Sequence, residues 1–181
     1  VQLLNELKVE SFDIVGHSMG GYVALEVKKI QKSCDKNILL NSNFWEDTAS
    51  KKEERHRVAA LVEQRKENFI NSSIPNLFVE PDLFQSELDA LIEEAKNISW
   101  ESIAAASIAM SERSNNSPLV KENQRDVCII QGAHDTVISA DLMARKLEGS
   151  EIIYHVLPSG HMAHIECSNL VRETIAKYLG P

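Results

Sequence analysis

Cysteine is scarce in this sequence, and its scarcity argues against two kinds of site. The three cysteines, Cys34, Cys128 and Cys167, lie far apart along the 181 residues. An odd number without motif spacing argues against a disulfide framework and a zinc site, and it favours a reducing compartment such as the cytoplasm. We therefore predict a cytoplasmic protein without a metal site. We also expect that it needs no cofactor.

Long apolar runs and an excess of positive charge are also absent. No stretch approaches the roughly 20 apolar residues that a membrane-spanning helix needs. Lysine and arginine number 19 against 27 acidic residues, and a net charge of -8 provides no basic surface for nucleic acid or an anionic membrane. The composition, with 43% hydrophobic residues, is that of a globular domain with a sizeable core.

Glycine is scarce too, yet three of the seven glycines fall within residues 16–21. Residues 12–15 are typical of a buried strand, Gly16–Gly20 is a G-x-S-x-G around Ser18, and residues 22–30 indicate a helix. Strand, motif and helix in succession are the context of a nucleophile elbow, in which flanking glycines avoid Cβ clashes at a sharp turn. The alternative is a glycine-rich turn that contains a serine by chance.

The pattern on either side of the middle segment predicts a mostly parallel α/β sheet. A second short apolar run at 37–40 completes strand, helix and strand, which implies parallel pairing. The pattern resumes with strands at 127–130 and 152–157, each followed by a helix. Between them, residues 43–118 show only helical periodicity, with helices expected near 50–70, 81–95 and 99–110 and a loop at 114–118. We expect an α/β core of residues 1–42 and 119–181, with 43–118 as a helical insertion.

Two further side chains follow later strands at the same edge of the predicted sheet. Asp135 comes after the strand at 127–130, and His161 comes after the strand at 152–157. Functional groups of parallel sheets gather at the carboxyl ends of strands, so we expect both near Ser18. A serine needs a base in hydrogen-bond reach and an acid that orients the base. His155 and His164 compete for the role of base, and Asp135 is also explained as a turn former or helix cap.

The blocks at 15–21, 130–135 and 160–166 resemble the signature motifs of the α/β-hydrolase superfamily, most closely its small esterase-like branch. The resemblance implies a helical cap at 43–118, Ser18 as nucleophile, His161 as general base and acid, and Asp135 as its orienting acid. The backbone N–H of Met19 would be one oxyanion donor. The substrate pocket is expected to include five side chains, namely His17, Phe44, Trp45, Trp100 and Val137.

The resemblance also implies strands before residue 12 that this chain lacks. We expect the C-terminal half of the sheet, and an N-terminal segment of the same fold from another chain or from residues outside the printed sequence. That segment would pair with residues 12–15 and supply the second oxyanion N–H. The implied function is hydrolysis of a small or medium, largely apolar ester through an acyl-enzyme. Thioesterase, carbon–carbon hydrolase, peptidase or haloperoxidase chemistry, a ligand-binding receptor and an inactive fragment remain alternatives.

Overall fold

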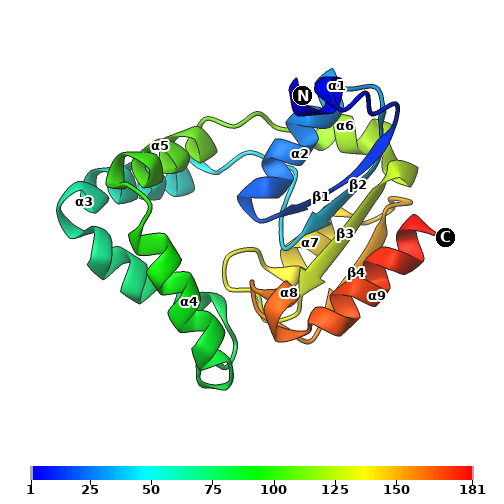
Figure 1. The fold of residues 1–181 in the computed structure, drawn as a ribbon. Helices are drawn as coiled ribbons and strands as arrows, with labels where there is room; N and C mark the ends of the chain where they lie inside the picture. The colour runs from blue at the N-terminus through cyan, green and yellow to red at the C-terminus, as the bar shows by residue number, and fades with distance from the viewer. Residues whose placement is uncertain (1, 181) are drawn as a thin grey trace. The chain divides into compact units, whose positions relative to one another are not determined.

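The structure, a computed structural model, describes residues 2–180 and divides into two compact units (Figure 1). One unit consists of the residues up to Phe44 and from Asn116 onward, and the other is Trp45–Asn115. Phe44 and Asn116, the residues of the first unit at the two boundaries, are both buried, and the Asn116 N–H donates to the Phe44 carbonyl, 2.8 Å away. Val1 and Pro181, which the predicted core includes, lie outside the described residues.

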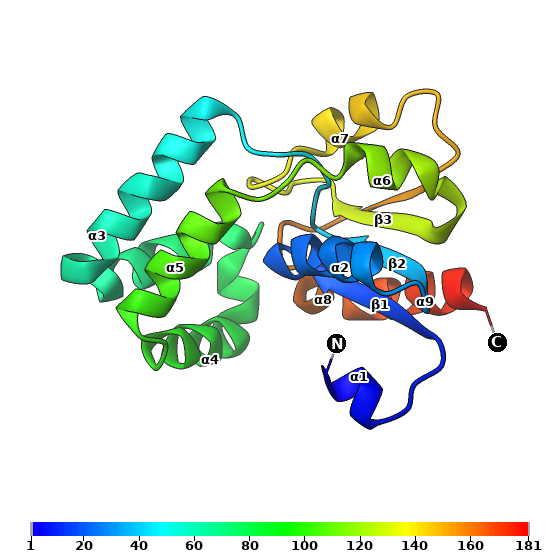
Figure 2. The same cartoon turned by 90° about the horizontal axis from the view of Figure 1, so that it is seen from above.

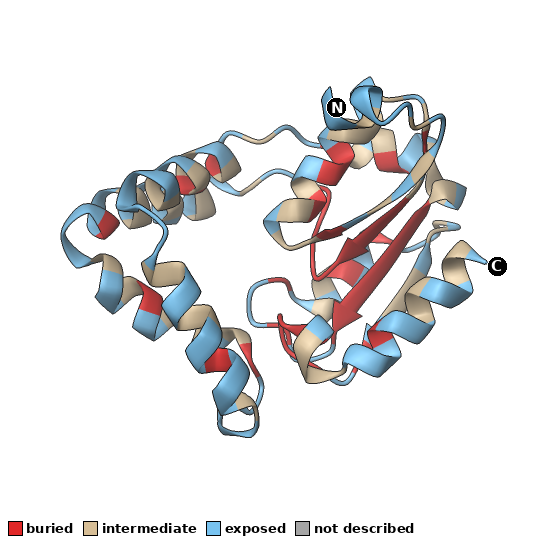
Figure 3. Cartoon of the chain, in the orientation of Figure 1, coloured by how far each residue is buried: buried red, intermediate tan, exposed pale blue. Residues whose placement is uncertain are grey.

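The first unit is built on four parallel strands in the order β1-β2-β3-β4, which confirms the predicted sheet. These are β1 (Phe12–His17), β2 (Cys34–Leu40), β3 (Val127–Gly132) and β4 (Ile153–Leu157). Every residue of β3 is buried, as is the last part of β2, whereas most residues of β1 and β4 are exposed or half-buried (Figure 3). Near-continuous burial is typical of central parallel strands covered on both faces.

Helices cover both faces of the sheet (Figure 2). On one face, α8 (Ala163–Glu166) and α9 (Ser168–Leu179) pack on alternate strand residues such as Leu40 and Ile130. The intervening residues Leu39 and Ile129 point to the other face because successive strand side chains alternate. That face carries the buried sides of α2 (Met19–Ile30), α6 (Ser117–Glu122) and α7 (Ala140–Lys146). A short α1 (Gln2–Glu6) precedes β1.

The second unit is helical at every described element. It comprises α3 (Ala49–Ser73), two short 3-10 helices at Pro75–Leu77 and Pro81–Phe84, α4 (Gln85–Lys96) and α5 (Trp100–Ser111). The Thr48 and Ser99 side chains cap α3 and α5 by accepting a backbone N–H from the first turn. The helix α3 bends at Arg65, whose φ of -134° and ψ of 35° are not helical.

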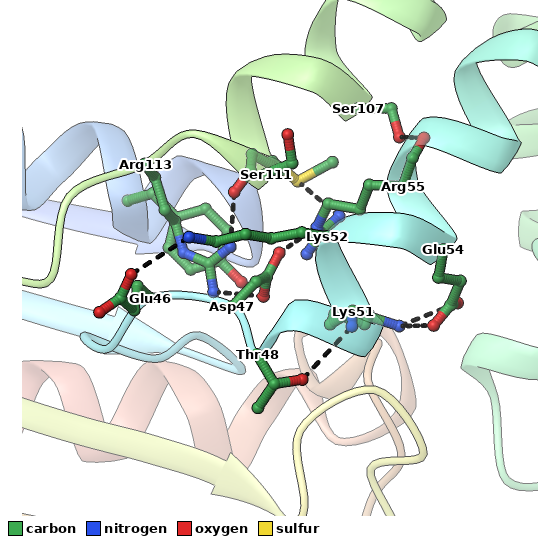
Figure 4. A network of polar contacts seen from close by, with 12 residues as sticks. Glu46, Asp47, Thr48, Lys51, Lys52, Glu54, Arg55, Ser107, Ser111 and Arg113 are labelled. Carbon is green, nitrogen blue, oxygen red and sulfur yellow. Dashed lines mark hydrogen bonds and ion pairs between the residues drawn. The ribbon is translucent and has the colours of Figure 1, made fainter.

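A buried ion cluster joins the start of this unit to its end (Figure 4). The Asp47 carboxylate lies between Arg55 and Arg113, and all three side chains are largely buried. The Ser107 hydroxyl on α5 also donates to the Arg55 carbonyl on α3. These contacts hold α5 beside α3. Neither helix has a strongly apolar face, and the surface of α3 is long and charged.

One local prediction in this part of the chain was wrong. The loop expected at 114–118 ends at Asn116, because α6 begins at Ser117 with Pro118 in its first turn, where a missing N–H costs nothing. A single helical turn at Ala163–Glu166 comes before α9. Within residues 2–180, no helix is both long and apolar enough to cross a bilayer.

Candidate active site

Ser18 occupies a strained turn between β1 and α2. Its φ of 50° and ψ of -119° lie in a region that non-glycine residues rarely adopt. The Ser18 N–H donates to the Leu40 carbonyl at the end of β2, 3.0 Å away, and the Ser18 carbonyl accepts from the Ser42 hydroxyl at 2.7 Å. The neighbouring strand thus holds the turn on both sides of the serine.

The glycines of the elbow do not all serve the same purpose. A Cβ on Gly16 would lie 2.4 Å from the Gly20 carbonyl oxygen, and a Cβ on Gly21 would lie 2.2 Å from the Ser42 hydroxyl oxygen. Among residues 2–180, apart from its chain neighbours and the backbone of its own helix, a Cβ on Gly20 would meet nothing within 4 Å. The close approaches therefore require glycine at Gly16, the first residue of the motif, and at Gly21, the residue that follows the motif. The sequence reasoning was wrong to give Gly20 the same role.

A chain of hydrogen bonds connects Ser18, His161 and Asp135. The His161 Nε2 lies 2.8 Å from the Ser18 Oγ, and the His161 Nδ1 lies 2.9 Å from the Asp135 Oδ2. An ionised carboxylate accepts only, so Nδ1 carries a proton, and Nε2 of the neutral ring accepts from the Ser18 hydroxyl. The His161 and Asp135 side chains are almost completely buried. This arrangement can move a proton from the serine to the imidazole.

Asp135 accepts more hydrogen bonds than that to His161 alone. Its Oδ1 accepts the backbone N–H groups of Val137 and Ile138, at 2.8 and 2.9 Å. Its Oδ2 also accepts from the amides of Asn41 and Gln131, at 2.9 and 2.7 Å. Burial alone would raise the pKa of Asp135, but the bond and charge of His161, with the Asn41 and Ile138 donors, hold the pKa below its usual value. The carboxylate therefore stays ionised at neutral pH.

His17 supports the loop that carries His161. Its Nε2 donates to the His161 carbonyl at 2.8 Å, and its ring lies 4.4 Å from that of His164, centroid to centroid. Burial lowers the pKa of His17 to about 4, despite the hydrogen bond to the His161 carbonyl, and the His164 and His161 rings lower it further. His17 is thus neutral at neutral pH and contacts the backbone of His161.

The competing histidines lie elsewhere. His164 faces His17, and His155 is half-buried within β4. Among residues 2–180, no group of three or more histidine, cysteine or acidic side chains is arranged to hold a metal ion.

The expected oxyanion donor and pocket residues are dispersed. Met19 is the first residue of α2, where backbone N–H groups lack acceptors within the helix. Val137 reaches the site through its backbone N–H, while its side chain is exposed. Phe44 is buried and lines a hollow of about 470 Å³ with α6 and the segment after α7. Trp45 and Trp100 belong to the helical unit, and Trp100 begins α5.

Sequence reasoning missed Asn41, Ser42 and Gln131. All three are buried polar residues at or beside the carboxyl ends of β2 and β3. Asn41 follows β2 directly, as the loop of Asp135 follows β3, so the argument from strand ends could have found it. Gln131 is an amide in β3, a strand whose other residues are apolar, cysteine or glycine. An amide within such a run was the signal in the sequence that could have identified it.

No protein-family model matches the sequence, and no curated protein does either. Solved structures do match. A thermophilic esterase from Thermogutta terrifontis is 25% identical with a TM-score of 0.87, and the match covers 98% of this chain and 68% of the esterase.

Two further structures share the fold at lower identity. An enol-lactonase from Burkholderia xenovorans is 17% identical with a TM-score of 0.81, covering 98% of this chain and 68% of its own. An alpha/beta hydrolase enzyme from a Medee basin deep-sea metagenome is 14% identical with a TM-score of 0.77, covering 99% of this chain and 69% of its own. Nearly all of this chain is matched by these structures, so the chain has the α/β-hydrolase fold over about two thirds of their length.

Proposed function

We propose that this chain carries the nucleophile, the base and the orienting acid of a serine hydrolase that cleaves a small or medium, largely apolar ester. The observation that supports it is the hydrogen-bonded chain from Ser18 through His161 to Asp135, with Ser18 on a strained elbow. The ester class is favoured because similar structures include esterases and an enol-lactonase, which act on ester and lactone bonds.

In the proposed first step, the Ser18 Oγ attacks the ester carbonyl carbon while its proton moves to the His161 Nε2. Asp135 holds the imidazole by Nδ1 and stabilises the positive charge that forms. The carbon–oxygen bond of the ester then breaks, and His161 gives its proton to the departing alcohol. In the second half, water loses a proton to His161, and its oxygen attacks the acyl carbon. Release of the acid returns the proton to Ser18.

The negative oxygen of each tetrahedral intermediate needs preorganised donors. We assign one to the Met19 N–H, which lies at the N-terminus of α2 next to Ser18. Among the described strands, β1 has β2 as its single neighbour. We propose that a further segment pairs along β1 and supplies the second donor, and that the Trp45–Asn115 unit is the cap of this hydrolase.

Turnover of p-nitrophenyl esters of graded chain length tests this function. Hydrolysis by the wild type should fall on the order of 10⁶-fold in kcat in Ser18→Ala, because no other group at the elbow can form the acyl-enzyme. Ser168→Ala, which changes an exposed serine at the start of α9, is the matched control and should leave the rate unchanged. A Ser18→Ala protein that retains wild-type turnover would contradict the proposal.

A further inference from the structure

Asn41 connects the acid of the site to the loop that carries the base. The side chain is fully buried, and its Nδ2 donates both to the Asp135 Oδ2 and to the Gly160 carbonyl, each at 2.9 Å. Gly160 directly precedes His161, so one amide group fixes the position of carboxylate and imidazole relative to each other. The backbone of Asn41 is left-handed, with a φ of 45°, a conformation that asparagine tolerates better than most residues.

Gln131 holds the same carboxylate oxygen from the neighbouring strand. It is fully buried on β3, and its Nε2 donates to the Asp135 Oδ2 at 2.7 Å and to the Ile138 carbonyl at 2.8 Å. The Ile138 N–H in turn donates to the Asp135 Oδ1. The Gln131 amide therefore binds one oxygen of the Asp135 carboxylate, and the backbone of residues 137–138 binds the other.

The amide nitrogens of Asn41 and Gln131 donate hydrogen bonds, whereas their amide oxygens accept none from the described residues. The Asn41 Oδ1 and the Gln131 Oε1 are buried and have no hydrogen-bond partner among the described residues. Leaving a buried acceptor unmet reduces stability, and an apolar side chain of similar shape would avoid that loss. Packing alone therefore does not account for these residues, whereas the need for donors beside a buried carboxylate does.

We propose that Asn41 and Gln131 are positioning residues that fix the orientation of Asp135 and limit how strongly it holds the proton of His161. The inference rests on the proposed hydrolase function. Three donors share the Asp135 Oδ2, namely the two amides and the His161 Nδ1. Each amide neutralises part of the carboxylate charge, so the imidazole can release its proton to the leaving group. Without them, the carboxylate turns more freely and retains the imidazolium to higher pH.

Gln131→Met and Asn41→Gly remove the donors, since methionine keeps the length of glutamine and glycine tolerates the left-handed backbone. Asn37→Leu is the matched control, because it changes a fully buried amide on β2 that has no hydrogen bond to Asp135. We expect the acid limb of the kcat/KM profile to move to higher pH by roughly half a unit to one unit in each donor variant. We also expect kcat to fall about ten-fold with KM within about two-fold, because orientation acts in the transition state. The control should retain the wild-type limb.

A second measurement separates this inference from the proposed function. NMR of the resting protein observes the hydrogen-bonded His161 Nδ1 proton without any turnover, and its resonance should shift in both donor variants but not in Asn37→Leu. Folded donor variants with an unchanged resonance, or with an unchanged acid limb and kcat, would overturn the inference while leaving the hydrolase function intact. A wild type that turns over no ester would refute the proposed function, and the resonance would still decide whether the amides position Asp135.

Discussion

The two adjacent glycines of the elbow should respond in opposite ways to the same substitution. In Gly21→Ala the new methyl group would lie 2.2 Å from the Ser42 Oγ and 2.5 Å from the Ser42 Cβ, so Ser42 must move. Its hydroxyl would then lose the 2.7 Å bond to the Ser18 carbonyl. In Gly20→Ala the methyl group meets nothing within 4 Å, and the residue lies in the first turn of α2.

These contacts determine how far the free energies of unfolding of Gly20→Ala and Gly21→Ala should differ. Overpacking costs about 1–3 kcal/mol and the lost hydrogen bond about 1 kcal/mol, so Gly21→Ala should lower the free energy of unfolding by about 2–4 kcal/mol. Gly20→Ala should leave it unchanged or raise it by up to about 1 kcal/mol, because alanine is the better helix former. Urea denaturation measures both, as a shift in midpoint at constant slope.

A double variant locates the cause. Ser42→Gly removes the two atoms closest to the Gly21→Ala methyl group, and the next closest is the Gly16 carbonyl oxygen, at 3.2 Å. The two substitutions should therefore be non-additive, with a coupling of about 1–3 kcal/mol. Equal stabilities for Gly20→Ala and Gly21→Ala, or strict additivity in the double variant, would refute the reasoning.

Three other perturbations have definite expected outcomes. Asp47→Asn removes the carboxylate that two buried arginines share, so the helical unit should lose about 3–5 kcal/mol, seen as faster proteolysis within residues 45–115. Asn37→Leu should raise the free energy of unfolding by about 1–3 kcal/mol, because it removes a buried amide that has no hydrogen-bond partner within residues 2–180, and an unchanged or lower value would contradict this. For His17, the unfolded chain binds a proton near pH 6.5 and the folded chain only near pH 4, so stability should fall by about 3 kcal/mol as the pH drops through that window. His17→Gln retains a donor for the His161 carbonyl but does not titrate, so denaturation at pH 7 and pH 4 should show a smaller loss than in the wild type.

The parts of the molecule that sequence reasoning predicted are those that depend on neighbours along the chain. The strand, glycine motif and helix around Ser18 form one continuous stretch, and Asp135 and His161 each follow a recognisable strand. The rule that parallel strands end at one edge was enough to expect them together.

The rest depends on contacts that the sequence does not display. The residues around Asn41 in the sequence do not distinguish it from an ordinary turn asparagine. Only the order of the strands brings it within hydrogen-bond distance of the Asp135 carboxylate, 94 residues along the chain. Asp47 and Arg113 are 66 residues apart, and nothing in the sequence around either residue indicates that the two form an ion pair. Hydrophobic periodicity identifies elements, but which buried polar groups meet is decided by tertiary packing.

The central claim is that Ser18 is a nucleophile activated by His161, and covalent labelling tests it most directly. A fluorophosphonate probe should add one label per chain, and mass spectrometry of the peptides should place the label on Ser18. His161→Gln should slow the labelling by several orders of magnitude while the protein stays folded, because the serine loses its base. A label on another residue, or labelling of the His161→Gln variant at the wild-type rate, would contradict the account.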